Sequence, residues 1–428
     1  LERFEPLVQS VFSARDMPKK TQNARKLRRF TVFRDDDGTV DTCILTGGSL
    51  EAPGAKVPPG VLSAISLKAQ SEGPGHLLPT DVSGRRVALA KWIADAQNPL
   101  TVRSIVNRIW QYHFGRGLAV NSNNFGAKGG KPTHPDLLDY LSRRFLESNW
   151  SIKKLHRAIV LSDVYRRSVV PVDEQKLALV DPENSVLTHF RRRRLTAEEI
   201  RDSLLAVSGE LVHADGGIPV FPEMNMEVAL QPRMIQFSLA PAYQPSVRRE
   251  ERNRRTIYAY HCRGLADPFL ELFNQPNPNE SCELRDDASV TPQALTLLNS
   301  DFMTARAVAM SHAICCETQN TEEAIGSAFR RILGREATIA EVEQLEIFMQ
   351  DTHENDERES KTKEPYPIEI SRSLVEEFSG RRFEYREILP KFENYEADLG
   401  MHEVSKHCRS LADVCLLLMN TNEFLFVD

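Results

Sequence analysis

Residues 101–114 read TVRSIVNRIWQYHF and carry the clearest helical pattern in the 428-residue chain. Six of their side chains recur at intervals of three or four residues: Val102, Ile105, Val106, Ile109, Trp110 and His113. This spacing lines one face of an α-helix over about three turns. Gly115 and Gly117 follow directly and can end the helix through a left-handed cap. The stretch therefore predicts an amphipathic helix and favours a mainly α fold.

Further helices are predicted on both sides of this stretch. Upstream, four apolar residues have helical spacing: Leu89, Trp92, Ile93 and Ala96. Downstream, Thr133 and Ser151 stand at helix starts. Their helices carry two seams: Leu138, Leu141 and Phe145, then Ile152, Leu155, His156 and Ile159. Capping residues mark five more starts towards the C-terminus: Thr196, Thr291, Thr321, Thr338 and Ser410.

Short β elements are expected between the helices. Phe30–Phe33 and Val40–Leu45 flank an Asp-Gly pair at residues 37–38, which predicts a hairpin. Val186–Arg192 and Thr256–Arg263 have the composition of strands. The expected fold class is mainly α with small β elements (α+β), an irregular multi-helix body with long ordered loops.

Composition also suggests the domain organisation. Residues 1–45 are a lead-in segment with the hairpin, residues 46–84 a Gly/Pro-rich connector, and residues 85–428 a helical domain. Residues 351–409 carry 15 acidic and 10 basic side chains, so we expect a mobile, solvated insertion there. The chain begins at Leu1 with no charged-then-apolar leader, and we expect it to be a piece of a longer or processed protein.

Several classes of protein are excluded by composition. Hydrophobic residues make up 41% and charged residues 27%, as in globular domains. No apolar run approaches the roughly 18 residues of a membrane helix, so no membrane span is expected. A net charge of −6 is too mild to indicate nucleic acid or a membrane surface. Seven cysteines without C-x-x-C or C-x-x-C-H predict no zinc finger, no attached haem and no cofactor or metal in this segment.

Three patterns resemble functional motifs but do not match them. Residues 126–133 lack the glycine spacing of a phosphate-binding loop. His402 and His407 are one residue too far apart for a zinc-protease helix. Arg191–Arg194 could bind phosphate, but acidic residues on the following helix can neutralise this run. Nucleic-acid binding is therefore the least favoured hypothesis.

Candidate site residues lie on the predicted helix at 101–114 and on its neighbours. Asn107, Arg108 and Gln111 give one flank of that helix directed hydrogen-bonding groups. Arg108 can grip a carboxylate or phosphate, or form an internal ion pair. Three histidines at helix seams or caps are either general bases or packing residues: His113, His134 and His156.

The best candidate is the polar loop at residues 274–293. It combines amides, hydroxyls, a thiol and an arginine, and its prolines limit its freedom. Arg285 favours a reactive thiolate at the nearby Cys282, whereas four acidic residues oppose it: Glu280, Glu283, Asp286 and Asp287. Gln293 closes the segment. Polar loops longer than about 12–15 residues are usually functional or disordered, and functional and structural interpretations both stay open here.

Eight segments resemble, in order, the planctomycete-type C-terminal domain of unknown function. They are Asn107–Gly117, Thr133–Asp139, Trp150–His156, Ser162–Arg166, Arg192–Asp202, Ser281–Arg285, Pro292–Asn299 and Asn422–Asp428. The resemblance adds Tyr165 and Arg166 to the candidate ligand-binding residues. It also implies that the lead-in segment comes from an upstream domain. The family domain ends large bacterial proteins that often contain a c-type cytochrome-like part.

The resemblance therefore implies an extracytoplasmic protein, in the periplasm or cell envelope, with haem c possible on an upstream domain. Upstream domains of the same polypeptide would be its partners. The chain departs from the family at Thr46-Gly47-Gly48, where Arg-Gly-Asn is usual, and at Tyr112 and Arg191, where His and Asn are usual. The insertion at 351–409 resembles one branch of the family only. The family has no established activity.

Three functional hypotheses follow. The first is a binding or assembly module that docks a protein or glycan partner. The second is an uncharacterised hydrolase of a glycan or anionic substrate, with one of the three histidines as base and Arg108 or Arg285 steadying an anion. The third is nucleic-acid binding through Arg191–Arg194. Whether the chain is an enzyme is left open.

Overall fold

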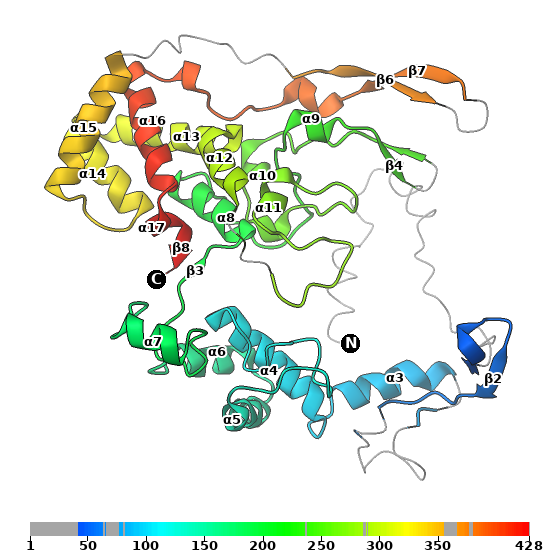
Figure 1. The fold of residues 1–428 in the computed structure, drawn as a ribbon. Coiled ribbons are helices and arrows are strands. Elements are labelled where there is room, and N and C mark those ends of the chain that lie inside the picture. The colour runs from blue at the N-terminus through cyan, green and yellow to red at the C-terminus, as the bar shows by residue number, and fades with distance from the viewer. Residues whose placement is uncertain are drawn as a thin grey trace, which may run out of the picture. The chain divides into compact units, whose positions relative to one another are not determined.

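The computed structural model describes residues 42–62, 65, 77–79, 82–235, 238–285, 288, 290–354, 366–375 and 380–427 (Figure 1). Within these residues the chain forms fifteen α-helices and four two-stranded antiparallel sheets. The predicted class, mainly α with small β elements, is confirmed. The chain divides into two compact units: residues up to Val106 with Asp136–Ile152, and Asn107–Pro135 with Lys153 onwards.

A small antiparallel ladder begins the described chain. Strand β1 (Cys43–Leu45) pairs with β2 (Pro53–Lys56), and the 3₁₀ turn η2 (Thr46–Gly48) lies between them. Gly47 has a φ of +61°, a conformation that glycine adopts without strain. The predicted strand Phe30–Phe33 lies outside the described residues, and β2 falls in the segment predicted as a connector.

The helices predicted around residues 101–114 are present. They are α3 (Val82–Ile93), α4 (Pro99–Phe114), α5 (Pro135–Glu147) and α6 (Ile152–Val160). The α5 seam of Leu138, Leu141 and Phe145 is buried, as predicted. Ala96 lies beyond the end of α3. Helix α7 (Glu174–Val180) was not predicted; its cap is the Asp173 carboxylate, which accepts the Lys176 N–H.

The main apolar core belongs to the second unit. It is built by α8 (Ala197–Val207), α11 (Pro268–Leu272), α12 (Thr291–Asn299), α13 (Asp301–Glu317), α14 (Thr321–Ile332), α15 (Ile339–Glu354), α16 (Lys406–Met419) and α17 (Asn422–Leu425). Helices α13 to α16 pack side by side (Figure 1). The capping boxes predicted at Thr196 and Thr338 are present, with Glu199 and Glu341 as their third residues.

Three sequence predictions are wrong in the second unit, each for a local reason. Val186–Arg192 is not a strand, because the Asp181 and Asn184 side chains accept its backbone N–H groups and hold turns. Strand β3 is only Arg193–Arg194, and it pairs with β8 (Phe426–Val427). Thr256–Arg263 begins with the 3₁₀ turn η4 (Thr256–Tyr258), because the Asp202 carboxylate accepts the Thr256 N–H at 2.7 Å. Helix α16 begins at Lys406 rather than Ser410, since Ser405 caps it.

The remaining elements lie either between residues 226 and 252 or inside the charged insertion at 351–409. They are α9 (Met226–Ala229), β4 (Arg233–Ile235), β5 (Ser238–Ala240), α10 (Arg249–Arg252), β6 (Glu369–Val375), β7 (Arg382–Ile388), η5 (Pro390–Asn394) and η6 (Met401–Glu403). The β6–β7 hairpin leads into Leu389 and Phe392, which are buried with Ala242. The expectation of a solvated insertion is therefore wrong for this part of residues 351–409.

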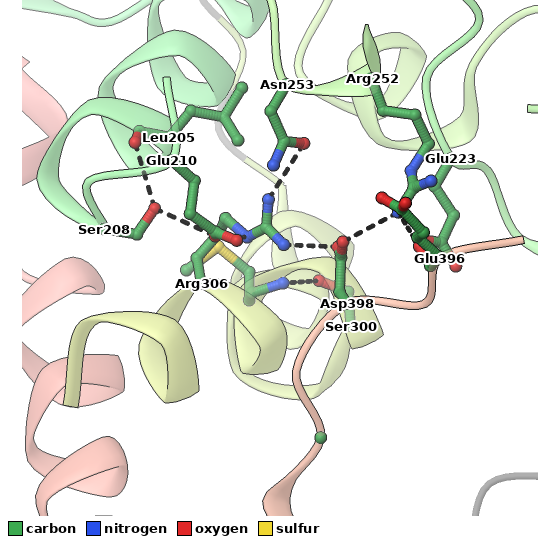
Figure 2. Close-up of polar contacts among 12 residues, drawn as sticks. Leu205, Ser208, Glu210, Glu223, Arg252, Asn253, Ser300, Arg306, Glu396 and Asp398 are labelled. Atoms are coloured by element: carbon green, nitrogen blue, oxygen red, sulfur yellow. Dashed lines mark hydrogen bonds and ion pairs between the residues drawn. The ribbon is translucent and has the colours of Figure 1, made fainter. Parts of the chain in front are cut away.

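A buried ionic network joins this insertion to the core (Figure 2). Asp398 lies between two guanidinium groups: it pairs with Arg306 of α13 and, at 3.1 Å, with Arg252 of α10. Arg306 is fully buried and also pairs with Glu210 at 3.0 Å, while Asn253 accepts a hydrogen bond from it at 3.3 Å. Charges removed from water in this way need partners at close range.

We predict that Asp398→Ala destabilises the protein by about 3–5 kcal/mol, because it leaves two buried arginines without a shared counter-charge. The measurement is a urea titration followed by far-UV circular dichroism. Glu336→Ala is the control: its pair with Arg330 has exposed fractions of 73% and 53%, and its loss should cost less than about 1 kcal/mol. Equal losses for the two variants would contradict a central role for Asp398.

Candidate functional site

The polar loop between α11 and α12 has no helix or strand in its described residues 274–285, 288 and 290. Pro276 and Pro278 each remove a backbone donor, and the Asn277 side chain accepts the Asn279 N–H at 3.0 Å. These local features favour turns over regular structure. The predicted long polar loop is therefore present.

Gln293 holds the two ends of this loop together. Its side chain is buried, and its amide nitrogen donates to the carbonyls of Leu272 at 2.8 Å and Ala288 at 3.1 Å. Its oxygen accepts a hydrogen bond from Arg194 at 2.6 Å. A side chain so occupied positions the loop and is not available to a ligand.

Arg285 is held by an acidic partner on the core. Its two terminal nitrogens bind the two oxygens of Glu198, on α8, at 2.5 and 3.1 Å. This fork geometry is the strong form of an arginine–carboxylate pair. Burial raises the pKa of Glu198, but the hydrogen bonds and charge of Arg285 outweigh it, so the net pKa is lowered. The pair therefore stays ionised near neutral pH, and Arg285 fixes the end of the loop.

The polar flank of α4 meets the loop, a contact that the sequence left open. Gln111 donates to the Glu283 carbonyl at 3.2 Å, and the Glu283 carboxylate accepts the Asn123 N–H at 2.7 Å. Asn107 is buried and binds both backbone groups of Ala119, at 2.8 and 2.9 Å, which shapes the segment before Asn123. Arg108 donates to the Asn123 side chain. Asn107 and Arg108 thus hold the segment 119–123, whose Val120 and Asn121 line the site.

Together these segments surround an open hollow of about 570 Å³, here named the polar hollow. Val120 and Asn121 line one side, and Glu271, residues 274–277 and residues 280–285 line the other. Cys282 is exposed there, with its sulfur 3.3 Å from the Leu284 carbonyl. Among the described residues, no group of three or more His, Cys, Asp or Glu side chains is arranged to hold a metal ion. The hollow is instead lined with amide and carboxylate groups, which bind ligands by hydrogen bonds.

His113 and His156 form a second cluster. Nε2 of His113 lies 2.7 Å from Nδ1 of His156, and the Tyr165 ring meets His113 edge-on at 5.4 Å. Burial and the charge of His156 lower the pKa of His113. Residues 111 and 113 are about 200° apart around a helix, so His113 points away from the polar flank of α4. The cluster is therefore separate from Arg108 and Arg285.

Two remaining candidates join neither cluster. His134 contacts the neighbouring Thr133 hydroxyl at 3.1 Å, and the exposed Arg166 pairs with Asp163 at 2.5 Å. In the basic run, Arg193 forms a two-point pair with Glu199 at 2.7 and 2.9 Å. Arg193 and Arg194, the latter bound to Gln293, thus serve internal contacts.

The residues that sequence reasoning missed are the partners of the candidates. Glu198 holds Arg285 in place, and Glu271 lines the polar hollow from α11. Glu198 did have a signal, because it lies in the arginine-rich segment 192–202 that carries the family resemblance. Glu271 had none, since nothing in its neighbours distinguishes it from a solvent-facing helix residue.

The sequence of this mainly helical domain also matches a known family model. The model described as PSD1, a protein of unknown function (DUF1553), matches residues 85–349, well over half of the chain. The chain therefore belongs to this family. No curated protein and no solved structure matches it significantly. Within the described residues, no helix has both the length and the apolar character to cross a membrane.

We predict that Gln293→Ala lowers the free energy of unfolding by about 1–3 kcal/mol, because buried carbonyls of the loop lose their donor. Thermal and urea unfolding measure this loss. Gln350→Ala on the exposed side of α15 is the matched control, and it should change stability by less than about 0.5 kcal/mol. A neutral result for Gln293→Ala would mean that the loop ends hold without the amide.

We predict that His113 makes the protein less stable as pH falls. Its folded pKa lies below the ordinary 6.5, so the unfolded chain takes up the proton first. Stability from this group is complete above pH 6.5 and declines as pH drops towards the folded pKa, by at most about 1.4 kcal/mol per pH unit. Unfolding between pH 7.5 and pH 5 should show a flatter slope for His113→Asn than for His134→Asn. Identical slopes would show that His113 is not the responsible group.

Proposed function

We propose that this domain is a binding module and that the polar hollow is its recognition site. The observation that carries the proposal is the meeting of the α4 flank and the polar loop at Glu283. Two segments about 170 residues apart are fastened there, by Gln111 at 3.2 Å and the Asn123 N–H at 2.7 Å. Convergent polar groups in an open concavity are typical of a ligand site.

The side chains that remain accessible suit binding. Within the part of the chain that the structure describes, the carboxylates of Glu271 and Glu280 have no hydrogen-bond or ion-pair partner, and both line the hollow. The fixed groups around them, Arg285 and Glu283, keep the concavity in shape. A prearranged wall lowers the conformational entropy that the protein loses when a ligand binds, and the uncommitted carboxylates can accept hydrogen bonds from that ligand.

The hydrolase alternative receives less support from the same geometry. A base with an anion-stabilising arginine would need His113, His134 or His156 beside Arg108 or Arg285. The histidine pair lies on the other side of α4, and the charge of Arg285 is neutralised by Glu198. Among the described residues, no hydrogen bond joins any of the three histidines to either arginine. The arrangement favours recognition over turnover.

The family resemblance supports a wider setting for the proposal. It favours a domain at the end of a large extracytoplasmic protein with a c-type cytochrome-like part, in the periplasm or cell envelope. Haem c would then belong to an upstream domain, and this segment would need no cofactor of its own. The upstream domains would be its partners within one polypeptide.

We predict binding without turnover. A panel of uncharged polyols, sugars and small amides, screened by saturation-transfer NMR, should contain compounds whose affinity Glu280→Ala weakens about ten-fold, because a charged acceptor is lost. Glu343→Ala removes an equally exposed carboxylate from α15 and should bind like the unmodified protein. Nitrophenyl glycosides, acetate and phosphate should not be hydrolysed. Equal binding by the two variants, or hydrolysis of any of these substrates, would overturn the proposal.

A further inference from the structure

A second hollow, of about 500 Å³, lies against the same polar loop. It shares Glu271, Gln275, Pro276 and Asn277 with the polar hollow, so the two concavities adjoin along this part of the loop. Each volume falls within the range of about 300–1,000 Å³ that is typical of small-ligand sites. A ligand made of linked units would have to cross this part of the loop to occupy both hollows.

Tyr260 gives this second hollow an aromatic wall, and we name it the aromatic hollow. The Tyr260 ring stacks on Phe221 with centroids 4.7 Å apart and an interplanar angle of 27°, yet 46% of the residue is exposed. Since Phe221 covers one face of the ring, the exposed portion is the opposite face and the edge. A ring that is supported behind and open in front offers a flat surface for another ring.

Phe221 is itself held firmly, so the platform is rigid. Its ring carries the Lys391 ammonium group at 4.4 Å and contacts the Tyr243 ring at 5.8 Å. The Tyr243 hydroxyl donates to the Pro222 carbonyl at 2.7 Å, and the Tyr260 N–H donates to the Val220 carbonyl at 2.8 Å. A platform fixed in this way loses little side-chain entropy when a ligand stacks on it.

Polar groups surround the platform. The aromatic hollow contains the amides of Gln231, Asn277 and Asn279 and the carboxylate of Glu271. Amides donate and accept, and carboxylates accept, so the set matches a ligand with many hydroxyl groups. The polar hollow contains the carboxylates of Glu271 and Glu280, and the charge of its arginine, Arg285, is neutralised by Glu198. The two carboxylates therefore repel anions.

We infer that the ligand of this domain is an uncharged carbohydrate chain, with one sugar ring stacked on Tyr260 and further units bound in the polar hollow. This inference rests on the proposed function and gives the ligand class for the same site. The apolar face of a pyranose ring covers the tyrosine, while its hydroxyl groups meet the surrounding amides and carboxylates. Acidic polysaccharides are excluded by the carboxylates.

The test uses isothermal titration of the whole chain with neutral hexasaccharides of β-1,4-linked glucose, mannose, xylose and N-acetylglucosamine, and with a hexauronate. At least one neutral hexasaccharide should bind and the hexauronate should not. Tyr260→Ala should weaken that binding about ten-fold, whereas Tyr260→Phe, which keeps the ring, should stay within about two-fold.

The outcomes separate this inference from the proposed function. The polar-hollow compounds identified with Glu280→Ala should bind Tyr260→Ala unchanged, which also shows that this variant is folded. If those compounds bind but no neutral hexasaccharide does, or if Tyr260→Ala binds the hexasaccharide as tightly as Tyr260→Phe, the carbohydrate inference fails and the binding module stands. If no compound binds in either assay, both fail.

Discussion

The position of Asp398 between Arg252 and Arg306 is the constraint on which the second unit depends. Arg306 comes from the central helix α13, Arg252 from α10, and Asp398 from the far end of the insertion (Figure 2). Two desolvated cations tolerate one another only with a carboxylate between them. The chain must therefore bring Asp398 back onto the core, whereas Leu389 and Phe392 form a separate apolar cluster with Ala242. Lys391, which lies between Leu389 and Phe392 in the sequence, places its ammonium group over the Phe221 ring on which Tyr260 stacks.

The polar hollow depends on a different kind of interaction. Several of its side chains are hydrogen-bonded within the protein, and they hold the loop and the opposite wall in place. Gln293 joins the loop ends, Arg285 docks the loop on Glu198, and Asn107 shapes the opposite wall. Each was a candidate for ligand contact, and each has its hydrogen-bonding groups occupied. The groups left over are less conspicuous, namely the carboxylates of Glu271 and Glu280. Ligand recognition at the proposed site would thus come from residues whose type alone does not indicate a functional role.

Sequence patterns predicted those features that are local. The capping box at Thr196 needs only the next three residues, and the α5 seam needs only a repeat of three and four. Helix α13 was not predicted as a separate helix, because the polar side chains of Arg306 and Ser311 interrupt its buried face and its apolar residues form no single stripe. The strand predicted at Val186–Arg192 failed because Asp181 and Asn184 bind the backbone first. The polar loop was found by composition, whereas its contact with Gln111 spans 172 residues and leaves no local trace.

The pairing of β3 with β8 has a practical consequence for handling the protein. The ladder is short, but the Leu195 N–H also donates to the Leu425 carbonyl at 2.8 Å, directly before α8 begins. Arg194 belongs to the same short stretch and donates a hydrogen bond to Gln293, the residue that joins the two ends of the polar loop. Removal of Phe426 and Val427 would leave β3 as an unpaired strand edge, open to pairing with another chain, beside the residue that binds Gln293. Any shortened version of the protein should therefore keep Phe426 and Val427.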